Sequence, residues 1–405
     1  MTRGVGGSTA AAELAKFRSM RDAVPPVLAE ERSTRLARIQ SLMRAQGVQA
    51  LYLDASTTNF YFTGLRLKGS ERLHGAVIPA EGEIGYITPA FEQAKLETMI
   101  ALPGRIHAWQ EHEDPTALVV DAVRAMGYAS GTIAIDPATP FFIVDGLRRA
   151  GNSFDFINAR PLAAACRMVK STAEIALIEH AMNLTLAVQR ATAAILRPGI
   201  ATTEVEAFVA QAHTALGFDL PASFCIVLFG EATAYPHGVP YPQILKPGDT
   251  VLIDIGAPMH GYQSDITRSY VFGEPSARQR EVWDVEKRAT EAVFAAAQPG
   301  ATCESLDRAA RDVIEAAGFA REYGLPGLPH RTGHGIGLDV HEEPYIVRGD
   351  RTRLTPGMCF SNEPTICIYG EFGMRLEDHI HMTESGPAWF TPPAPSIEDP
   401  FGLDG

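Results

Sequence analysis

The sequence predicts a two-domain protein of mixed helices and strands, with a smaller α/β domain followed by a larger α+β domain. A chain of 405 residues is too long for one ordinary hydrophobic core. Strand-like and helix-like runs alternate in the first part of the chain, whereas beyond Ala163 long helices precede groups of strands. The predicted ranges are an N-terminal extension, the α/β domain, the α+β domain and a C-terminal tail: 1–30, 31–165, 166–395 and 396–405.

Residue periodicity and stop signals define the elements of the first domain. Residues 31–46 carry apolar side chains at helical spacing, and Gly47 is a favourable residue for ending that helix. Short β-branched and aromatic runs predict strands, and two amphipathic runs predict helices. These strands are expected at 48–54, 76–80, 84–90 and 132–137, and the helices at 91–100 and 116–127.

The second domain begins with a long helix. Ser171 or Thr172 is a good N-cap, and Arg197-Pro198-Gly199 ends the helix after Leu196. The same reasoning predicts the other helices at 202–217, 276–297 and 303–318, and strands at 223–230, 249–256, 263–273, 357–368 and 373–383.

The composition limits the class of partner and the compartment. The net charge is −13 without a long basic run, which argues against nucleic acid or an anionic membrane surface as the main partner. The five cysteines are scattered and form no CxxC pair, which favours reduced thiols over disulfides. Neither a convincing signal peptide nor an apolar run of about eighteen residues is present. We therefore expect a cytoplasmic protein.

Two acidic residues lie on either side of a turn in GDTVLIDIGAPMHGYQSDITRSY, residues 248–270. If residues 258–261 form the turn, residues whose numbers sum to 519 face each other, and Asp254 faces Asp265. Opposed side chains in an antiparallel pair have Cβ atoms roughly 4.5–5.5 Å apart, and like charges repel at that distance.

A second segment, CFSNEPTICIYGEFGMRLEDHI, repeats this arrangement. A turn at Gly370 pairs residues whose numbers sum to 740, so Glu363 faces Glu377. Buried carboxylates need compensation, and the nearby bases are few, namely Arg268 and Arg375. Four carboxylates could hold two divalent cations; oxygen donors favour Mn²⁺, and a nitrogen ligand admits Co²⁺, Fe²⁺ or Zn²⁺. The alternatives are acid pairs that share a proton, or a wrong register.

The segment PHRTGHGIGLDVHEEP, residues 329–344, supplies candidate nitrogen ligands. Glycines surround His334 and allow a close backbone approach, but they do not follow a strand as a dinucleotide-binding motif requires. His341 and, in AYPHGVPYP, His237 are further candidates. Other histidines are expected to be structural or exposed: His107, His112, His213 and His330.

The order of these motifs resembles the pita-bread metallopeptidases, which include methionine aminopeptidase, aminopeptidase P and Xaa-Pro dipeptidase (prolidase). The resemblance covers residues from about 166 to 388. The segment 50–65 is similar to the N-terminal domain shared by prolidase, aminopeptidase P and creatinase, which methionine aminopeptidases lack. The matching residues are His237, Asp254, Asp265, His334, His341, Glu363 and Glu377.

The resemblance implies a pita-bread catalytic domain, a creatinase-like N-terminal domain and two divalent metal ions. Asp254 would chelate one ion, Asp265 and Glu377 would bridge both, and His334 with Glu363 would complete the second. A hydroxide that bridges the metals would attack the substrate, and Glu363 would also accept the proton of the attacking water.

Further roles follow from the same resemblance. His237 and His341 would stabilise the tetrahedral intermediate, move a proton to the leaving nitrogen or bind the substrate carboxylate, and Arg375 would orient the acids. The substrate carboxylate could also meet one of three arginines: Arg348, Arg351 or Arg353.

The sequence departs from the family pattern at two positions. Thr365 stands where glycine usually follows the Glu-Pro pair, and Cys367 stands where the family has tyrosine. Tyr369 has the same strand parity as Cys367 and could replace that tyrosine.

The predicted function is Xaa-Pro dipeptidase, an enzyme that hydrolyses dipeptides with a C-terminal proline, with homodimers as in the family. Aminopeptidase P, acting on longer peptides, is the first alternative. A creatinase-like enzyme without metals and a non-catalytic binding protein on the same fold are the others.

Overall fold

The computed structural model describes residues 2–403 and divides into two compact units. The smaller unit is Val27–Arg167, and the larger unit joins the residues up to Pro26 to those from Met168 onward. These limits differ by a few residues from the predicted boundaries at 31 and 166. The segment predicted as an extension therefore belongs to the larger unit as far as Pro26.

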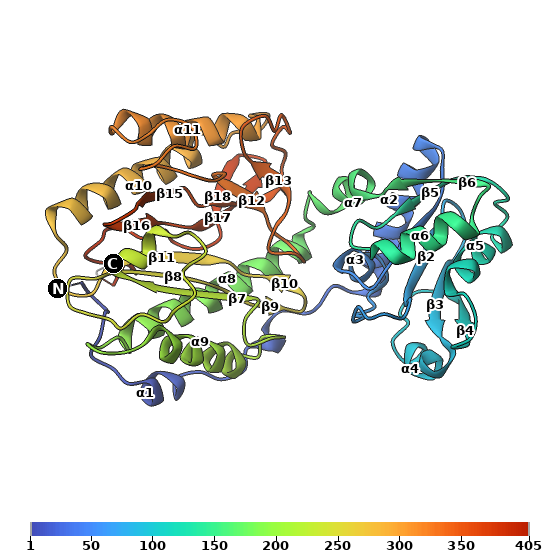
Figure 1. Cartoon of the computed structure of the whole chain (residues 1–405), viewed down its shortest axis with the longest axis horizontal. Helices are drawn as coiled ribbons and strands as arrows, with labels where there is room; N and C mark the ends of the chain where they lie inside the picture. Colours follow the sequence, from blue (N-terminus) through green and yellow to red (C-terminus); the bar gives the residue numbers. More distant parts are fainter. Residues whose placement is uncertain (1, 404–405) are drawn as a thin grey trace. The chain divides into compact units, whose positions relative to one another are not determined.

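The smaller unit is built on a six-stranded mixed sheet of order β4-β3-β2-β1-β5-β6 (Figure 1). β1 runs parallel to β5 and antiparallel to β2. Its elements are α2 (Ala29–Gln46), β1 (Val48–Leu53), α3 (Thr57–Thr63), β2 (Gly75–Pro79), β3 (Ile84–Pro89), η2 (Ala90–Glu92), α4 (Gln93–Glu97), β4 (Gly104–Trp109), α5 (Pro115–Ala125), β5 (Gly131–Ile135), α6 (Phe141–Ala150), β6 (Phe154–Asn158) and α7 (Arg160–Arg167).

Helices α5 and α6 cover one face of this sheet. Their apolar side chains, such as Val120 and Leu147, form a core with Ala50, Tyr52 and Ile133 of the sheet. The strands and helices predicted for this domain are observed within a few residues, and the α/β class is confirmed. The sequence interpretation missed α3, β4, α6, β6 and α7.

The larger unit has two main sheets, of order β11-β8-β7 and β13-β12-β14-β17-β18. Two-stranded ladders, β9 with β10 and β15 with β16, extend them. Its elements are α1 (Ala10–Leu14), η1 (Arg21–Ala23), α8 (Thr172–Ala194), α9 (Thr202–Leu216), β7 (Phe224–Phe229), η3 (Gly230–Ala234), β8 (Thr250–Gly256), β9 (Pro258–Met259), β10 (Tyr262–Gln263), β11 (Ile266–Val271), α10 (Ala277–Ala296), α11 (Cys303–Ala316), β12 (Gly333–Gly335), β13 (Glu342–Ile346), β14 (Cys359–Asn362), β15 (Thr365–Ile368), β16 (Phe372–Arg375), β17 (Asp378–Thr383) and β18 (Gly386–Trp389).

Two pairs of helices flank these strands (Figure 1). α8 and α9 pack against β7, β8 and β11, whereas α10 and α11 pack over the strands from β13 to β16. α8 begins where the sequence predicts, because Ser171 and Glu174 form a reciprocal capping box. Trp283 and Leu306 of α10 and α11 share a core with Phe360 of β14. The α+β class is confirmed.

The first acidic hairpin forms, but its predicted register is wrong by two residues. Paired residues in β8 and β11 have numbers that sum to 521, so Thr267 rather than Asp265 lies opposite Asp254. The turn contains only His260 and Gly261, both with positive φ, as a two-residue hairpin turn requires. Because side chains alternate with a period of two, a two-residue shift leaves both carboxylates on one face.

The second acidic hairpin has the predicted register. Both β15 with β16 and β14 with β17 pair residues whose numbers sum to 740. Glu363 and Glu377 lie at the break between these two ladders, where Glu377 instead forms a bridge with Thr267. This bridge joins the two main sheets next to the acidic residues.

Both chain ends pack on the larger unit. Arg21 forms an ion pair with Asp219 at 2.5 Å, and the ring of His260 lies 2.9 Å from the Arg21 carbonyl oxygen. In the predicted tail 396–405, Ile397 and Phe401 are buried, and residues 404–405 lie outside the described residues. Within residues 2–403, no helix is long and apolar enough to cross a membrane.

Candidate active site

The predicted site residues converge on one cavity of about 280 Å³ in the larger unit. The five predicted metal ligands come from both main sheets: β8 and the residue before β11 from the first, and β12, the residue after β14 and the residue before β17 from the second. The acidic and histidine residues that line the cavity are Asp254, Asp265, His334, Glu363, Glu377, His237 and His341, and Arg375 lines it with them. Residues separated by more than 120 positions in the chain are thus brought together as the sequence predicts.

The five predicted metal ligands form two overlapping clusters. Asp254, Asp265 and Glu377 each present an oxygen such that the three atoms lie within 4.8 Å of one another. His334, Glu363 and Glu377 form a second group on the same criterion. Glu377 belongs to both groups, as the predicted bridging role requires.

His334 is oriented for ligation through Nε2. Its Nδ1 lies 3.1 Å from the Gly335 carbonyl oxygen, and its Nε2 lies 2.9 Å from Glu363 Oε1 and 3.6 Å from Asp265 Oδ2. A hydrogen bond from Nδ1–H to a carbonyl is the usual way in which a ligating histidine is fixed in its tautomer. Nε2 then directs a lone pair at two carboxylates, where a cation fits between them.

The glycines beside His334 are needed for close packing. A Cβ atom at Gly333 would overlap the Ser361 carbonyl oxygen, and one at Gly335 would overlap the main chain of Glu343. The His334 main-chain N–H donates to Ser361 Oγ at 2.8 Å. The tight fit of β12 between β13 and β14 therefore fixes the position of the imidazole.

Burial makes the acidic cluster hard to ionise fully. Burial raises the pKa of Asp265 well above its ordinary value, and the charges of Glu377 and Asp254 add to this effect. Burial likewise raises the pKa of Glu377 and Asp254. For Glu363 burial also favours the neutral acid, but the charge and hydrogen bond of His334 prevail and hold its pKa well below the usual range.

Arg375 compensates part of this charge. Its Nη2 donates to Asp254 Oδ2 at 2.6 Å, and its Nε donates to Thr267 Oγ1, which in turn donates to Glu377 Oε2 at 2.6 Å. The side chain is buried, so these bonds are shielded from solvent. The predicted orienting role of Arg375 is consistent with this chain of contacts.

The donor set fits divalent cations. Within the described part of the chain, Asp254 Oδ1 and Glu377 Oε1 are buried without a hydrogen-bond partner. A buried carboxylate oxygen left in this way is costly, whereas a cation would satisfy it. Four carboxylates and one imidazole are ligands that Mn²⁺, Co²⁺, Fe²⁺ and Zn²⁺ accept.

His237 and His341 are exposed and line the same cavity. The rings of His341 and His334 meet edge to face, with centroids 4.2 Å apart. Burial of part of the ring lowers the pKa of His341 to about 4, and the neighbouring His334 adds to the shift, so His341 is neutral at pH 7. The lining of the cavity also includes the apolar residues Phe224 and Ile226.

The three arginines considered for the substrate carboxylate are not among the described residues that line the cavity. Arg348 pairs with Glu322 at 2.8 Å, Arg351 lies 3.7 Å from Glu304, and Arg353 donates to a main-chain oxygen. Their contacts lie elsewhere on the larger unit.

Cys367, at the position where the family has tyrosine, and Tyr369, its possible replacement, are also not among the described residues that line the cavity. Cys367 is fully buried, and burial raises the pKa of its thiol to about 12, so it is not a reactive thiolate. Tyr369 is 54% exposed and stacks on Tyr235 at 4.9 Å. Neither residue therefore contributes a hydroxyl to the described lining of the cavity.

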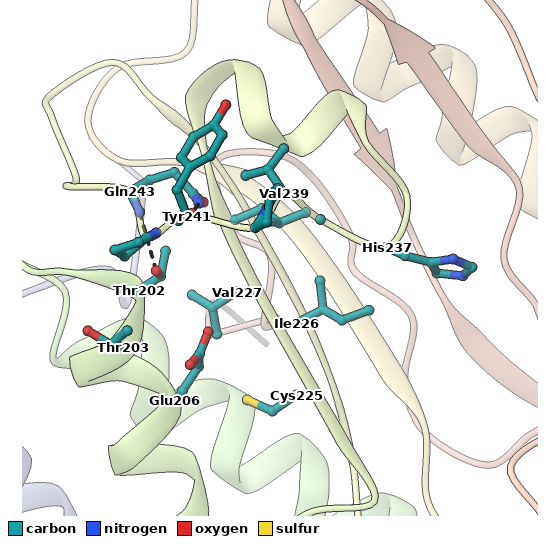
Figure 2. Close-up of a pocket in the computed structure, with 14 residues that line it drawn as sticks. Thr202, Thr203, Glu206, Cys225, Ile226, Val227, His237, Val239, Tyr241 and Gln243 are labelled. Atoms are coloured by element: carbon teal, nitrogen blue, oxygen red, sulfur yellow. Dashed lines mark hydrogen bonds between the residues drawn. The ribbon is translucent and has the colours of Figure 1, made fainter.

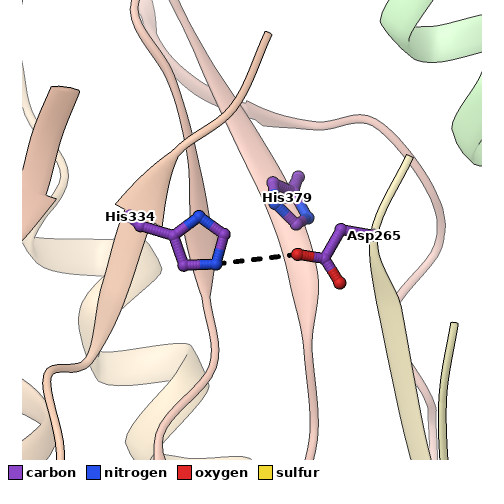
Figure 3. Close-up of side chains that lie close together, drawn as sticks. All are labelled: Asp265, His334 and His379. Atoms are coloured by element: carbon purple, nitrogen blue, oxygen red, sulfur yellow. Dashed lines mark ion pairs between the residues drawn. The ribbon is translucent and has the colours of Figure 1, made fainter. Parts of the chain in front are cut away.

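The sequence interpretation missed His379, which is buried next to Asp265 and His334. Its ring, that of His334 and the carboxylate of Asp265 lie close together in Figure 3. The signal was its position two residues after Glu377, which puts both side chains on one face of the strand.

A second pocket, of about 260 Å³, lies beside the first. The two share Ile226 and His237, and in Figure 2 the His237 ring points away from Thr202 and Glu206 of the second pocket. His237 therefore lies on the segment between the two pockets.

Two family models match the chain. The model of metallopeptidase family M24 matches residues 176–384, and the model of the creatinase/prolidase N-terminal domain matches residues 35–169. The chain is 37% identical over 361 residues to "Probable dipeptidase PepE" of Mycobacterium tuberculosis, covering 88% of this chain and 94% of that protein. It is 32% identical over 368 residues to an Xaa-Pro dipeptidase of Lactobacillus helveticus, covering 88% and 96%.

Solved structures show the same likeness. The crystal structure of dipeptidase PepE from Mycobacterium ulcerans superposes with a TM-score of 0.83 at 34% identity, covering 91% of this chain and 97% of that one. The similarity thus spans both units.

Proposed function

The chain belongs to metallopeptidase family M24, and from this membership we propose that it is a dinuclear metal-dependent Xaa-Pro dipeptidase. Membership confirms the resemblance inferred from the motifs, and with it the pita-bread domain preceded by a creatinase-type N-terminal domain. The observation that carries the proposal is the convergence of five ligand residues, two of them with unpartnered buried oxygens, on a cavity with an apolar wall.

Five residues would hold the two cations: Asp254, Asp265, His334, Glu363 and Glu377. When bound, the ions would supply a water of lowered pKa and would polarise the scissile carbonyl. Glu363, which lines the cavity beside His334, would accept a proton from the attacking water.

Three other residues would orient the substrate and the acids. Arg375 would hold the Asp254 carboxylate in place and, through Thr267, that of Glu377. His341 is neutral and next to His334, so its ring N–H can donate to an oxygen that gains negative charge. His237, on the exposed side of the cavity, would meet the substrate carboxylate or the leaving nitrogen.

The cavity also suits a proline-containing dipeptide. Phe224, Ile226 and Val340 form an apolar surface against which a pyrrolidine ring can pack. The amide before proline has no N–H and a fixed φ, so recognition through a backbone donor is impossible and a shaped apolar wall must replace it. The proposed partners are therefore such a dipeptide and, for assembly, a second copy of the chain.

The test is hydrolysis of Ala-Pro and Ala-Pro-Ala by metal-stripped protein before and after addition of Mn²⁺ or Co²⁺. Metal-dependent cleavage of Ala-Pro alone is the expected result. Cleavage of the tripeptide in preference would make the protein an aminopeptidase P. Cleavage of neither peptide with either metal would contradict the proposal. Glu363→Gln is the inactive control, and Glu371→Gln, at an exposed turn, is the matched neutral one.

A further inference from the structure

His379 lies in the acidic cluster without a role in the proposed mechanism. It sits on β17, where it pairs with Ser361 of β14, and its side chain is 0% exposed. Glu377 lies two positions earlier, so both side chains project from the same face of the chain. A rigid central strand, rather than a loop, thus presents the imidazole to the cluster.

The imidazole is within ligand distance of the same site as two predicted ligands. One ring nitrogen of His379, one of His334 and one oxygen of Asp265 all lie within 4.8 Å of one another. The rings of His379 and His334 have centroids 6.0 Å apart and are inclined at 66° to each other, and both lie close to the Asp265 carboxylate (Figure 3). This is a cation-sized arrangement of two nitrogens and one oxygen.

Both ring nitrogens are also unsatisfied. In residues 2–403, neither Nδ1 nor Nε2 of His379 has a hydrogen-bond partner of normal geometry, and the nearby main chain of Asp265 makes only a weaker contact with the ring. Burying an unpaired polar atom is unfavourable, and buried polar groups in native proteins are almost always paired. A histidine retained only for packing would cost more here than an apolar residue of similar size.

We propose that His379 is an additional nitrogen ligand of the cation held by Asp265 and His334. The inference rests on the metal site of the proposed function and extends its ligand set from five residues to six. A second imidazole would raise the affinity of the site for Co²⁺, Fe²⁺ or Zn²⁺ relative to Mn²⁺. The inference therefore shifts the expected preference away from the Mn²⁺ favoured by the sequence interpretation.

The first test needs no substitution. The metal-stripped full-length protein is loaded with Co²⁺, and exchangeable imidazole N–H signals shifted by the paramagnetic ion are counted by proton NMR. Ligation by His334 and His379 gives two such signals, whereas ligation by His334 alone gives one. One signal would overturn the inference, as would a protein that binds no Co²⁺.

The second test compares Co²⁺ and Mn²⁺ affinities by titration calorimetry for wild type, His379→Leu and His379→Asn. His381→Asn is the matched control, because His381 is a half-buried histidine on the same strand that is in none of the metal-sized clusters of the described residues. The expected result is a loss of Co²⁺ affinity of roughly 10-fold or more in both His379 variants, with a smaller loss for Mn²⁺. Equal Co²⁺ affinity in wild type and in a folded His379 variant would overturn the inference.

These readouts separate the inference from the proposed function. A protein that binds Co²⁺ with two histidine signals but cleaves neither peptide would retain the ligand assignment and lose the proposed activity. A protein that cleaves Ala-Pro but shows one signal would retain the activity and lose the assignment of His379.

Discussion

Four carboxyl groups in one cavity, three of them buried and that of Glu363 partly buried, make charge the dominant feature of the site at the scale of single residues. In the metal-free protein, mutual repulsion and burial raise the pKa of Asp254, Asp265 and Glu377, which means that their ionisation destabilises the fold. Among the described residues of the cavity lining, Arg375 offsets part of this charge through its bond to Asp254, and His334 lies 2.9 Å from Glu363. A bound cation would reduce this repulsion and so stabilise the folded protein.

The first prediction concerns Asp265→Asn. The metal-free variant should unfold at a higher temperature than the metal-free wild type at pH 7, by about 2–4 °C, because one repelling charge is removed. It should lose most of the stabilisation that Mn²⁺ or Co²⁺ gives the wild type. Calorimetry with and without chelator measures both effects, and Asp284→Asn, at an exposed position of α10, is the control. A lower metal-free melting temperature in Asp265→Asn would contradict the repulsion argument.

The second prediction concerns His213, a fully buried histidine of α9. Nδ1 lies 2.9 Å from the Pro221 carbonyl oxygen, and burial lowers the pKa from 6.5 to about 4. The unfolded chain therefore binds a proton more readily than the folded one between these values. The stabilising effect of the neutral ring is complete above pH 6.5 and is lost as the pH falls toward 4, by about 3 kcal/mol in total.

Urea unfolding of wild type and His213→Gln at pH 7 and pH 4.5 checks this. The stability difference between the two proteins should shrink as the pH falls. The variant is needed because other buried groups titrate in the same range, such as Asp54, whose pKa burial raises to about 6. If the stability difference between wild type and His213→Gln did not change with pH, burial would not be lowering the pKa of His213 in the folded protein.

At the scale of elements, the glycines in and after the short strand β12 determine how closely it packs and so where His334 lies. Gly333 directly precedes His334, and Gly337 follows it by three residues. Neither glycine has a positive φ, so the backbone conformation at each position is one that alanine can adopt. They differ in what a methyl group would meet: the Ser361 main chain at Gly333, but at Gly337 the carboxylate of Glu342, a buried side chain that pairs with Lys170 at 2.8 Å. The two positions therefore form a matched pair.

The third prediction follows from that difference. Gly333→Ala should lower stability by about 2 kcal/mol or more and weaken metal binding, because β12 must move away from β14 and carry His334 with it. Gly337→Ala should cost less than Gly333→Ala and leave metal binding closer to wild type, because the Glu342 side chain and its ion pair with Lys170 must adjust but the main chain of β12 need not. Urea unfolding and metal titration of both variants measure the two effects. Equal costs would mean that the packing of β12 is looser than the structure indicates.

Strand pairing also shows how far the sequence predicts this site. Side chains alternate between the two faces of a strand, so the spacing of Asp254, Asp265, Glu363 and Glu377 was enough to predict which face each carboxylate occupies. The error of two residues in the register of the first hairpin moves no side chain to the other face. The error itself came from the turn, because Pro258 reads as a turn residue but pairs in β9 while His260 adopts positive φ.

Other features of the fold and the site depend on packing between elements that are distant in the chain, and the sequence pattern indicates them only weakly. His379 shares a strand with Glu377, but its approach to His334 depends on β17 and β12 both flanking β14, which periodicity does not reveal. In the smaller unit, β4 and β6 form the two edges of the sheet, and their partly exposed residues lack a continuous apolar run. Burial of the Cys367 thiol likewise became evident only from the fold.

At the scale of the whole molecule, every residue of the metal site belongs to one compact unit. Each unit has a hydrophobic core of its own, one between α10, α11 and the strands, the other between α5, α6 and the six-stranded sheet. Units with separate cores can unfold in separate steps. A ligand that binds one folded unit stabilises that unit by mass action and not the other.

The fourth prediction is therefore a calorimetric profile of the full chain with two transitions, only one of which responds to metal. At a free Co²⁺ concentration of about 100 times the dissociation constant, the larger unit should gain about 2.7 kcal/mol, and chelator should reverse the shift. The transition of Val27–Arg167 should stay in place. Thiol labelling at each temperature identifies which unit has unfolded. Labelling of Cys166 reports the smaller unit, in which this cysteine is buried. The larger unit is reported by the buried cysteines Cys303, Cys359 and Cys367, whereas Cys225 is only partly buried. A shift of both transitions by the same amount would show that the metal site stabilises the two units as one cooperative body, and the smaller unit would then take part in the energetics of catalysis.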